Sequence, residues 1–133
     1  MSIRAEGMFE VTSQREPPYD TADGVVLGRT SLTKQFTGGL DATSTVQMLA
    51  AGTPVPGSAG YVALERVSGR LAGRSGSFVL QHTGWMRGEE THLAVTVVPD
   101  SGTGELKGIS GQMTIQIADG KHHYTFEYLL ERA

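Results

Sequence analysis

Residues 111–130 have the sequence GQMTIQIADGKHHYTFEYLL, in which two alternating runs flank an Asp119-Gly120 pair. Asp-Gly between alternating runs is a strong hairpin signal, because a type I′ turn needs positive φ at both central residues. Centring the turn there predicts inner-face pairs: Ile117 with His122, Ile115 with Tyr124, Met113 with Phe126 and Gly111 with Tyr128. Since side chains alternate with period 2, one register explains an apolar face and a polar face. We expect any functional surface on the apolar face.

The composition indicates one ordered domain over residues 1–133. A chain of this length can bury a substantial core. Apolar residues make up 38% and there are only 5 prolines, which argues against disorder. The net charge is −3 and the basic residues are scattered, so we expect no nucleic-acid partner.

The composition also bears on the compartment. The sequence contains no cysteine, which fits a reducing environment. Residues 1–6 lack the apolar segment of a secretory signal, and no run approaches the ~18 apolar residues of a membrane-spanning helix. We therefore expect a cytoplasmic protein with no membrane partner.

Two further hairpins are predicted in the middle of the chain. A turn at Ala72-Gly73 joins strands 61–71 and 74–87, and a turn near Gly88-Glu89 leads into the next strand. The first register opposes Val67 to Phe78, Glu65 to Leu80, Ala63 to His82 and Tyr61 to Gly84. The second opposes Leu80 to Val97, His82 to Val95 and Gly84 to Leu93. Both registers place the same side chains of strand 74–87 on one face.

The remaining segments are assigned from alternation and turn composition. The expected strands are 5–12, 28–36, 40–49 and 105–117, with loops over 13–27 and 50–60. A three-residue loop at 37–39 places Leu32, Lys34 and Phe36 beside Leu40, Ala42 and Ser44. A short helix over 44–51 is the alternative to a strand end there.

About eight strands joined mostly by short turns predict an all-β fold with little helix. An eight-stranded antiparallel closed β-barrel is favoured over a sandwich, because closure removes the exposed edge strands of a meander.

Three stretches carry a family resemblance: GYVALERVSG (residues 60–69), GRSGSFVLQHTG (73–84) and VVPDSGTGEL (97–106). They resemble a family of short bacterial proteins of unknown function with an allene-oxide-cyclase-like β-barrel fold. The resemblance covers nearly the whole chain and implies an eight-stranded antiparallel barrel that often self-associates. It implies no settled activity, and the likeness to plant allene oxide cyclases, which bind an apolar epoxide, is one of architecture alone.

The predicted registers gather an acid and an imidazole on the inner face. Glu65 is a diagonal neighbour of His82, at the ~7–8 Å that long side chains can bridge. Such a pair in an apolar barrel suits proton transfer, so Glu65 and His82 are the candidate catalytic residues. The candidate ligand-binding residues are those expected to share their face: Tyr61, Phe78, Leu80, Val95, Met113, Ile115, Tyr124, Phe126 and Tyr128.

Metal and cofactor sites are not expected. Adjacent His122 and His123 point to opposite faces of a strand and cannot share an ion. Glu65, His82 and His122 could converge, but no recognised metal-binding spacing supports a site. Glycines 102–108 lack the strand-to-helix context of a phosphate-binding loop, so we expect no cofactor.

The outer face of the middle hairpin is unusually apolar. It carries Val62, Leu64, Val79 and Trp85, with Arg66 and Gln81 among them. Such a patch suggests a covered surface, for which a homodimer or a layer from residues 13–27 are the two explanations.

Three interpretations of the inner polar pair remain open. The first is a barrel that binds a small apolar ligand, and the second adds acid–base chemistry of a cyclase or isomerase on an oxygenated substrate. The third is a non-catalytic structural or interaction module, whose lumen is filled by its own side chains and whose buried polar groups only fix strand register.

Overall fold

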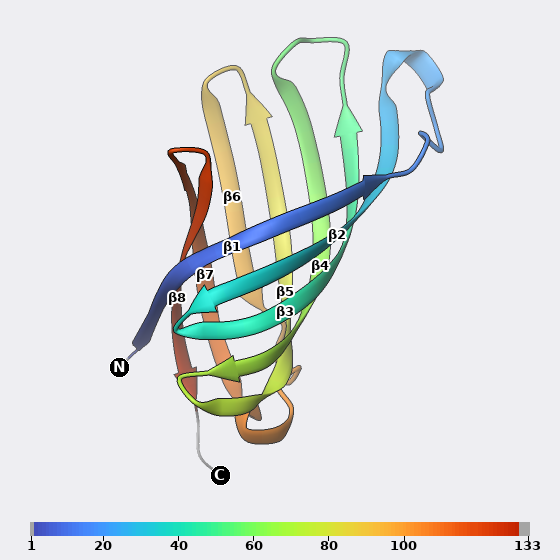
Figure 1. Ribbon diagram of the computed structural model, residues 1–133. Helices are drawn as coiled ribbons and strands as arrows, with labels where there is room; N and C mark the ends of the chain where they lie inside the picture. Colours follow the sequence, from blue (N-terminus) through green and yellow to red (C-terminus); the bar gives the residue numbers. More distant parts are fainter. Residues whose placement is uncertain (1, 131–133) are drawn as a thin grey trace.

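The computed structural model describes residues 2–130, which form eight strands and two short 3-10 turns. The strands are β1 (Ile3–Arg15), β2 (Val26–Gly38), β3 (Leu40–Gly52), β4 (Ser58–Leu71), β5 (Arg74–Arg87), β6 (Glu90–Val97), β7 (Ile109–Ala118) and β8 (Lys121–Leu130). The turns are η1 (Ala22–Gly24) and η2 (Gly104–Leu106). Strands pair antiparallel in chain order and β8 returns to β1, so the barrel closes (Figure 1). The predicted fold is confirmed.

The hairpin registers predicted from the Asp-Gly and Ala-Gly turns are confirmed. Every predicted pair of β7 with β8, of β4 with β5 and of β5 with β6 is present. Asp119 and Gly120 have φ of 54° and 73°, as a type I′ turn requires. No helix in the described part of the chain is long and apolar enough to cross a membrane.

Several strand boundaries predicted from composition were wrong. The loop expected over 13–27 is shorter, because β1 continues to Arg15, which pairs with Thr30. Strand β4 begins within the loop expected over 50–60, and the strand expected to start at residue 105 starts at Ile109, after η2. The helix alternative over 44–51 is excluded, since β3 pairs with both neighbours there. Polar or small residues in these stretches resemble loops, but sheet pairing on both sides holds them extended.

The register predicted for β2 and β3 was displaced by two residues. Phe36 lies opposite Ala42, and Lys34 lies opposite Ser44. The last pair of β2 with β3 is Phe36 with Ala42, so more than three residues separate the paired parts of the two strands. The residues between them pair with other strands instead. Gly38 pairs with Gly7 of β1, whereas Leu40 pairs with Leu71 of β4. The predicted inner face is nevertheless retained, since a displacement of two residues preserves side-chain alternation.

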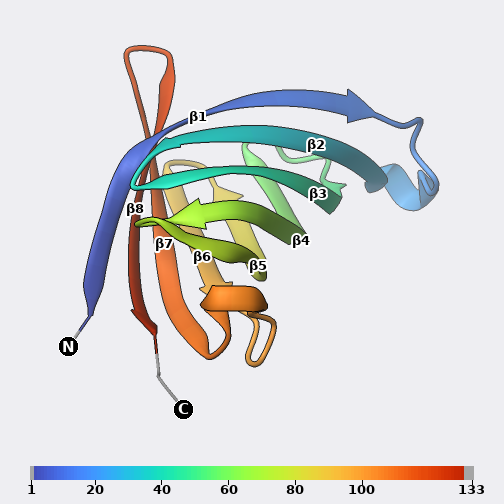
Figure 2. The same cartoon turned by 60° about the horizontal axis from the view of Figure 1, so that its bottom comes forward.

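The end of the barrel at the bottom of Figure 1, which we call the lower end, is densely packed. Phe78 stacks on Phe126, which stacks on Tyr128, with ring centroids 5.5 and 5.3 Å apart. The η2 turn lies across this end (Figure 2). Its Leu106 side chain is buried in the core. This half therefore supplies most of the hydrophobic core.

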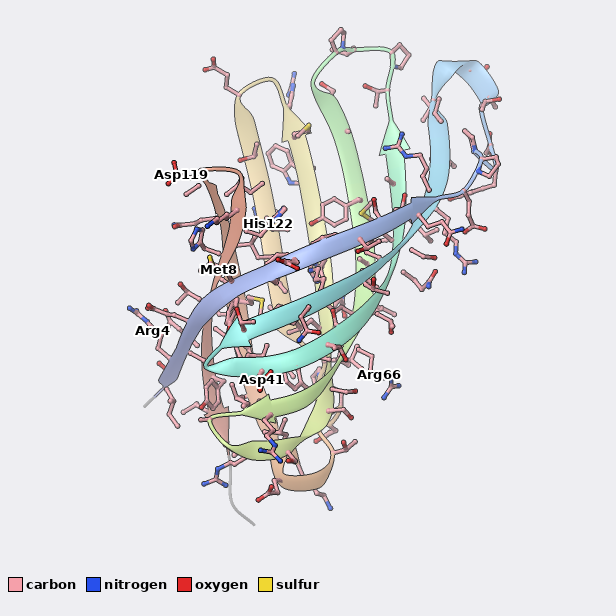
Figure 3. The ribbon with its side chains drawn as sticks, viewed as in Figure 1. Arg4, Met8, Asp41, Arg66, Asp119 and His122 are labelled. Atoms are coloured by element: carbon pink, nitrogen blue, oxygen red, sulfur yellow. The ribbon has the colours of Figure 1, made fainter. Side chains whose placement is uncertain are left out.

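The upper end of the barrel is open. Within residues 2–130, β6 and β7 share a single register pair, Thr96 with Gln112. Above that pair the β7–β8 hairpin leans away from β5 and β6, with Asp119 at its tip (Figures 1 and 3). Ile117, on the inner face of β7, is consequently 71% exposed. Strands β6 and β7 thus pair at a single level and separate above it.

Tyr124 ties three strands together at the packed end. Its hydroxyl donates a hydrogen bond to the carbonyl of Thr37 at 2.7 Å and accepts one from the amide of Leu40 at 2.9 Å. Gly7 permits this contact, because a Cβ there would collide with the Thr37 carbonyl and the Tyr124 hydroxyl. The hydroxyl of Tyr124 is therefore fully engaged within the fold.

Tyr124→Phe should lower the free energy of unfolding by about 1–3 kcal/mol, because it leaves buried partners of the hydroxyl unsatisfied. Tyr61→Phe is the matched control, since the Tyr61 hydroxyl makes no hydrogen bond within residues 2–130. That variant should stay within about 0.5 kcal/mol of the parent. Urea denaturation of the three proteins measures both effects, and equal losses would contradict the assignment.

Candidate functional site

The centre of the site is the carboxylate of Glu65, whose side chain is 0% exposed. Its Oε1 accepts hydrogen bonds from Nε2 of His82 at 2.7 Å and from Nζ of Lys34 at 3.1 Å. Its Oε2 accepts one from the hydroxyl of Ser44 at 2.6 Å. The predicted proximity of Glu65 and His82 is thus observed, and two more polar residues complete the group. We call Lys34, Ser44, Glu65 and His82 the polar cluster.

The polar cluster follows from the register of four neighbouring strands. Lys34 of β2 lies directly opposite Ser44 of β3. Ser44 faces Val67, two residues from Glu65 on the inner face of β4. His82 faces Ala63, which is two residues from Glu65 in the other direction. Each neighbouring pair is directly opposite or diagonal on the same face. The four side chains therefore form one row along the inner face, from β2 to β5.

Sequence reasoning missed Lys34 and Ser44 as members of the site. A signal was present, because Lys34 alternates in phase with Leu32 and Phe36 on an apolar face. The Lys34 ammonium lies 4.6 Å from the ring centroid of Phe9 and 5.9 Å from that of Phe36. These aromatic faces and the Glu65 carboxylate together stabilise the charge of a lysine that is only 9% exposed.

The pKa of Glu65 lies below its usual range. Burial acts in the opposite direction, but the His82 hydrogen bond, the charge of Lys34 and the Ser44 hydrogen bond together outweigh it and lower the pKa. An ionised carboxylate can only accept hydrogen bonds, so Nε2 of His82 carries the proton in their shared bond. In the neutral ring this leaves Nδ1 as the basic nitrogen.

Tyr61 lies directly above the polar cluster. Its ring covers Gly84, the next inner-face residue after His82 on β5, where a Cβ would collide with the ring. Burial and the negative charge of Glu65 both raise the pKa of Tyr61, so its hydroxyl keeps its proton at neutral pH. The side chain is half-buried, and its hydroxyl has no partner within residues 2–130.

Two adjoining cavities occupy the open upper half of the barrel. The first, of about 260 Å³, lies at β3 to β6 and is bounded by Tyr61, Met86 and Leu93. The second, of about 270 Å³, reaches towards β1 and β2. Both are lined by Met48, Ala50 and Ala59, and we call the combined space the cup. Its walls include inner-face residues of the strands that hold the polar cluster, together with Arg15 of β1 and Leu93 of β6. Trp85 and His92 of the outer face also border the first cavity.

The structure divides the predicted ligand-binding residues between two regions. Tyr61 lines the cup. Phe78, Leu80, Val95, Met113, Tyr124, Phe126 and Tyr128 are buried in the core, and Ile115 packs against it. Most of these inner-face side chains therefore pack on one another below the polar cluster rather than around the cup.

No three potential metal ligands among His, Cys, Asp and Glu converge within residues 2–130. His122 instead stacks on Phe9, with ring centroids 5.0 Å apart, close to the β7–β8 turn (Figure 3). Within residues 2–130, the hydrogen bonds of the polar cluster do not include His122.

A larger groove, of about 640 Å³, lies on the outer surface of the sheet. Its outer-face side chains include Gln47, Leu49, Val62 and Leu64, and Val62 and Leu64 are 52% and 55% exposed. Arg66 points away from the barrel on the same face (Figure 3). The apolar outer patch predicted from sequence is thus present, and the homodimer built on it stays a prediction. Ala63 and His82, a member of the polar cluster, also border this groove.

A protein-family model and a solved structure both match nearly the whole chain. The family model described as "Protein of unknown function (DUF3224)" matches residues 5–128. The chain is also similar to a solved protein of unknown function from the DUF3224 family of Shewanella oneidensis MR-1. That match has 48% sequence identity and a TM-score of 0.94, and it covers 99% of this chain and 100% of the other. No curated protein matches the chain. The likeness to allene oxide cyclases stays a prediction.

Lys34→Met should lower the free energy of unfolding by about 3–5 kcal/mol, because it leaves the buried Glu65 carboxylate without its counter-charge. Adding Glu65→Gln removes that charge, so the double variant should be more stable than Lys34→Met alone. Lys121→Met, at an exposed turn, is the control and should have little effect. Urea denaturation tests the cycle, and strictly additive losses would show that the two charges do not interact.

Acid should destabilise the folded chain through Glu65. Because its pKa is lowered on folding, the unfolded chain binds this proton at a higher pH than the folded chain. The stabilisation from Glu65 is complete above the ordinary glutamate pKa of about 4.3 and is lost as the pH falls through the folded pKa. Unfolding free energies measured between pH 6 and pH 3 should fall less steeply for Glu65→Gln than for Glu10→Gln, an exposed control. Parallel curves would contradict this assignment.

Proposed function

Since the chain belongs to the DUF3224 family of proteins of unknown function, its role must be argued from its own site, and we propose that it binds a small molecule inside the barrel. The ligand is mainly apolar, occupies the cup and presents an oxygen-bearing group to the polar cluster below. The observation that carries the proposal is an open apolar space directly above a buried charged group. Small-molecule sites combine these two features, a largely apolar lining and a few convergent polar groups.

The exposure of the cup lining supports ligand binding. Met86 and Leu93 are 46% and 45% exposed although they lie on the inner face of the barrel. Inner-face residues of the lower half, such as Phe78 and Leu80, are 0% exposed. Large apolar side chains that a fold leaves uncovered inside a concavity are typical of binding sites.

The polar cluster also supports proton transfer to and from the bound molecule. Glu65 orients His82 through Nε2, as a carboxylate orients the histidine of other general bases. Glu65 and His82 are therefore the catalytic residues of a proposed cyclase or isomerase that acts on an apolar oxygenated substrate. The walls of the cup would hold that substrate in its reactive conformation.

A second candidate is a non-catalytic structural or interaction module. The observation that favours it is the solid packing of the lower half, where aromatic rings fill the lumen. In that case the polar cluster serves to fix the register of β2 to β5.

Ala50→Trp should abolish binding of an apolar fluorescent probe, N-phenyl-1-naphthylamine, because the indole fills the cup. Thr45→Trp is the matched control, since it adds the same ring to the outer face of the same strand. A probe titration with the parent and both variants measures the effect. Saturable binding that Thr45→Trp retains and Ala50→Trp loses supports the proposal. No binding to the parent, or binding that Ala50→Trp keeps, would refute it.

A further inference from the structure

We propose that the substrate is an apolar ketone with an acidic hydrogen on the carbon next to its carbonyl group. Tyr61 donates a hydrogen bond to the carbonyl oxygen, and Nδ1 of His82 removes the proton. This inference rests on the proposed function, because it requires a ligand in the cup. It adds the substrate class and assigns a catalytic role to Tyr61.

One ring nitrogen of His82 makes no hydrogen bond within residues 2–130. Its Nε2 is occupied by Glu65, and Nδ1 makes no hydrogen bond within residues 2–130. In the described chain no buried side-chain nitrogen or oxygen lacks a partner, so Nδ1 retains accessible surface although His82 is only 4% exposed. His82 lies opposite Val95, one residue from the level at which the pairing of β6 with β7 ends. Ala63 faces both His82 and Met48, and Met48 lines the cup, so His82 lies at the level of the lowest part of the cup.

Tyr61 has an uncommitted donor beside that base. The contrast with Tyr124 is informative, since the Tyr124 hydroxyl is engaged by Thr37 and Leu40 and serves the fold. The Tyr61 hydroxyl has no partner within residues 2–130, and its ring lies over Gly84 next to His82. A buried tyrosine hydroxyl normally finds a partner, so a half-buried one that lines a cavity is available to a ligand.

The charges near Tyr61 argue against an anionic group at that position. Lys34 is the cation of the polar cluster, and Glu65 already engages its ammonium group. The first cavity, which Tyr61 lines, contains no lysine or arginine, whereas Arg15 and Glu16 line the second cavity. A phosphate or a second carboxylate beside Tyr61 would therefore lie among apolar side chains, which is costly. The Tyr61 hydroxyl and Nδ1 of His82 next to an apolar wall match a neutral carbonyl group.

The reaction is balanced without a further reactant. The C–H bond next to the carbonyl breaks, its proton moves to Nδ1, and its electron pair forms a C=C bond as the carbonyl becomes an enolate. The hydrogen bond from Tyr61 stabilises the charge on the oxygen. The imidazolium faces Glu65, which stabilises it, while Lys34 holds the carboxylate in place. The proton then returns to the same carbon or to a conjugated one, which gives an exchanged or isomerised ketone.

The test uses the bicyclic ketone 2-tetralone in deuterated water. Proton NMR follows the loss of the hydrogens next to the carbonyl, and a titration measures affinity separately. The parent protein should accelerate exchange at least ~100-fold over buffer, the lower range for general base catalysis. Tyr61→Phe should lower the exchange rate at saturation at least tenfold with affinity within threefold of the parent. His82→Gln should remove the acceleration.

The controls separate this inference from the proposed function. Gln81→Ala, next to His82 but on the outer face, should exchange as fast as the parent. If the naphthylamine probe binds in the cup but 2-tetralone exchange is not accelerated, the ketone assignment is refuted and ligand binding stands. If Tyr61→Phe exchanges as fast as the parent, the role of Tyr61 is refuted even where His82→Gln fails to fold. If no apolar probe enters the cup, both proposals fail.

Discussion

The structure depends on a buried carboxylate that is held by three donors. Glu65 has no solvent to stabilise its charge, so it must keep Lys34, Ser44 and His82 within hydrogen-bond distance. These partners come from three other strands, which means that the carboxylate fixes the register of β2, β3, β4 and β5 together. A slip of one residue in any of these strands would turn a partner outward and leave a charge buried alone.

The same carboxylate marks the boundary between two halves of the lumen. Below it, rings such as Phe78 and Phe126 stack and exclude solvent, and η2 covers the end. Above it, β6 and β7 separate and large side chains such as Leu93 stay partly exposed. The lower half supplies stability, so the upper half can remain open. A rigid floor of charged and hydrogen-bonded groups beneath an open space is an arrangement that suits a binding site.

The sequence predicted those parts of the fold that local chemistry determines. Period-2 alternation and the Asp119-Gly120 turn specify a register, and the same reasoning brought Glu65 and His82 together. It could not predict the contribution of Lys34, because a lysine on an apolar face acquires its partner only when strands from distant segments pair. The separation of β6 and β7 above their single register pair was also beyond sequence reasoning, since it depends on how far two strands twist apart rather than on the residues in either.

The energetics of buried ion pairs bear on why the polar cluster exists. Apolar side chains of similar volume can often replace a buried charged group without loss of stability, because desolvation offsets the attraction between the charges. Fixing register does not require an ion pair either, since the apolar pairs of β7 with β8 define theirs without one. Structural need therefore accounts poorly for charges at this level of the barrel. A role towards a molecule in the cup accounts for their position, because they lie where the packed core ends and the open space begins.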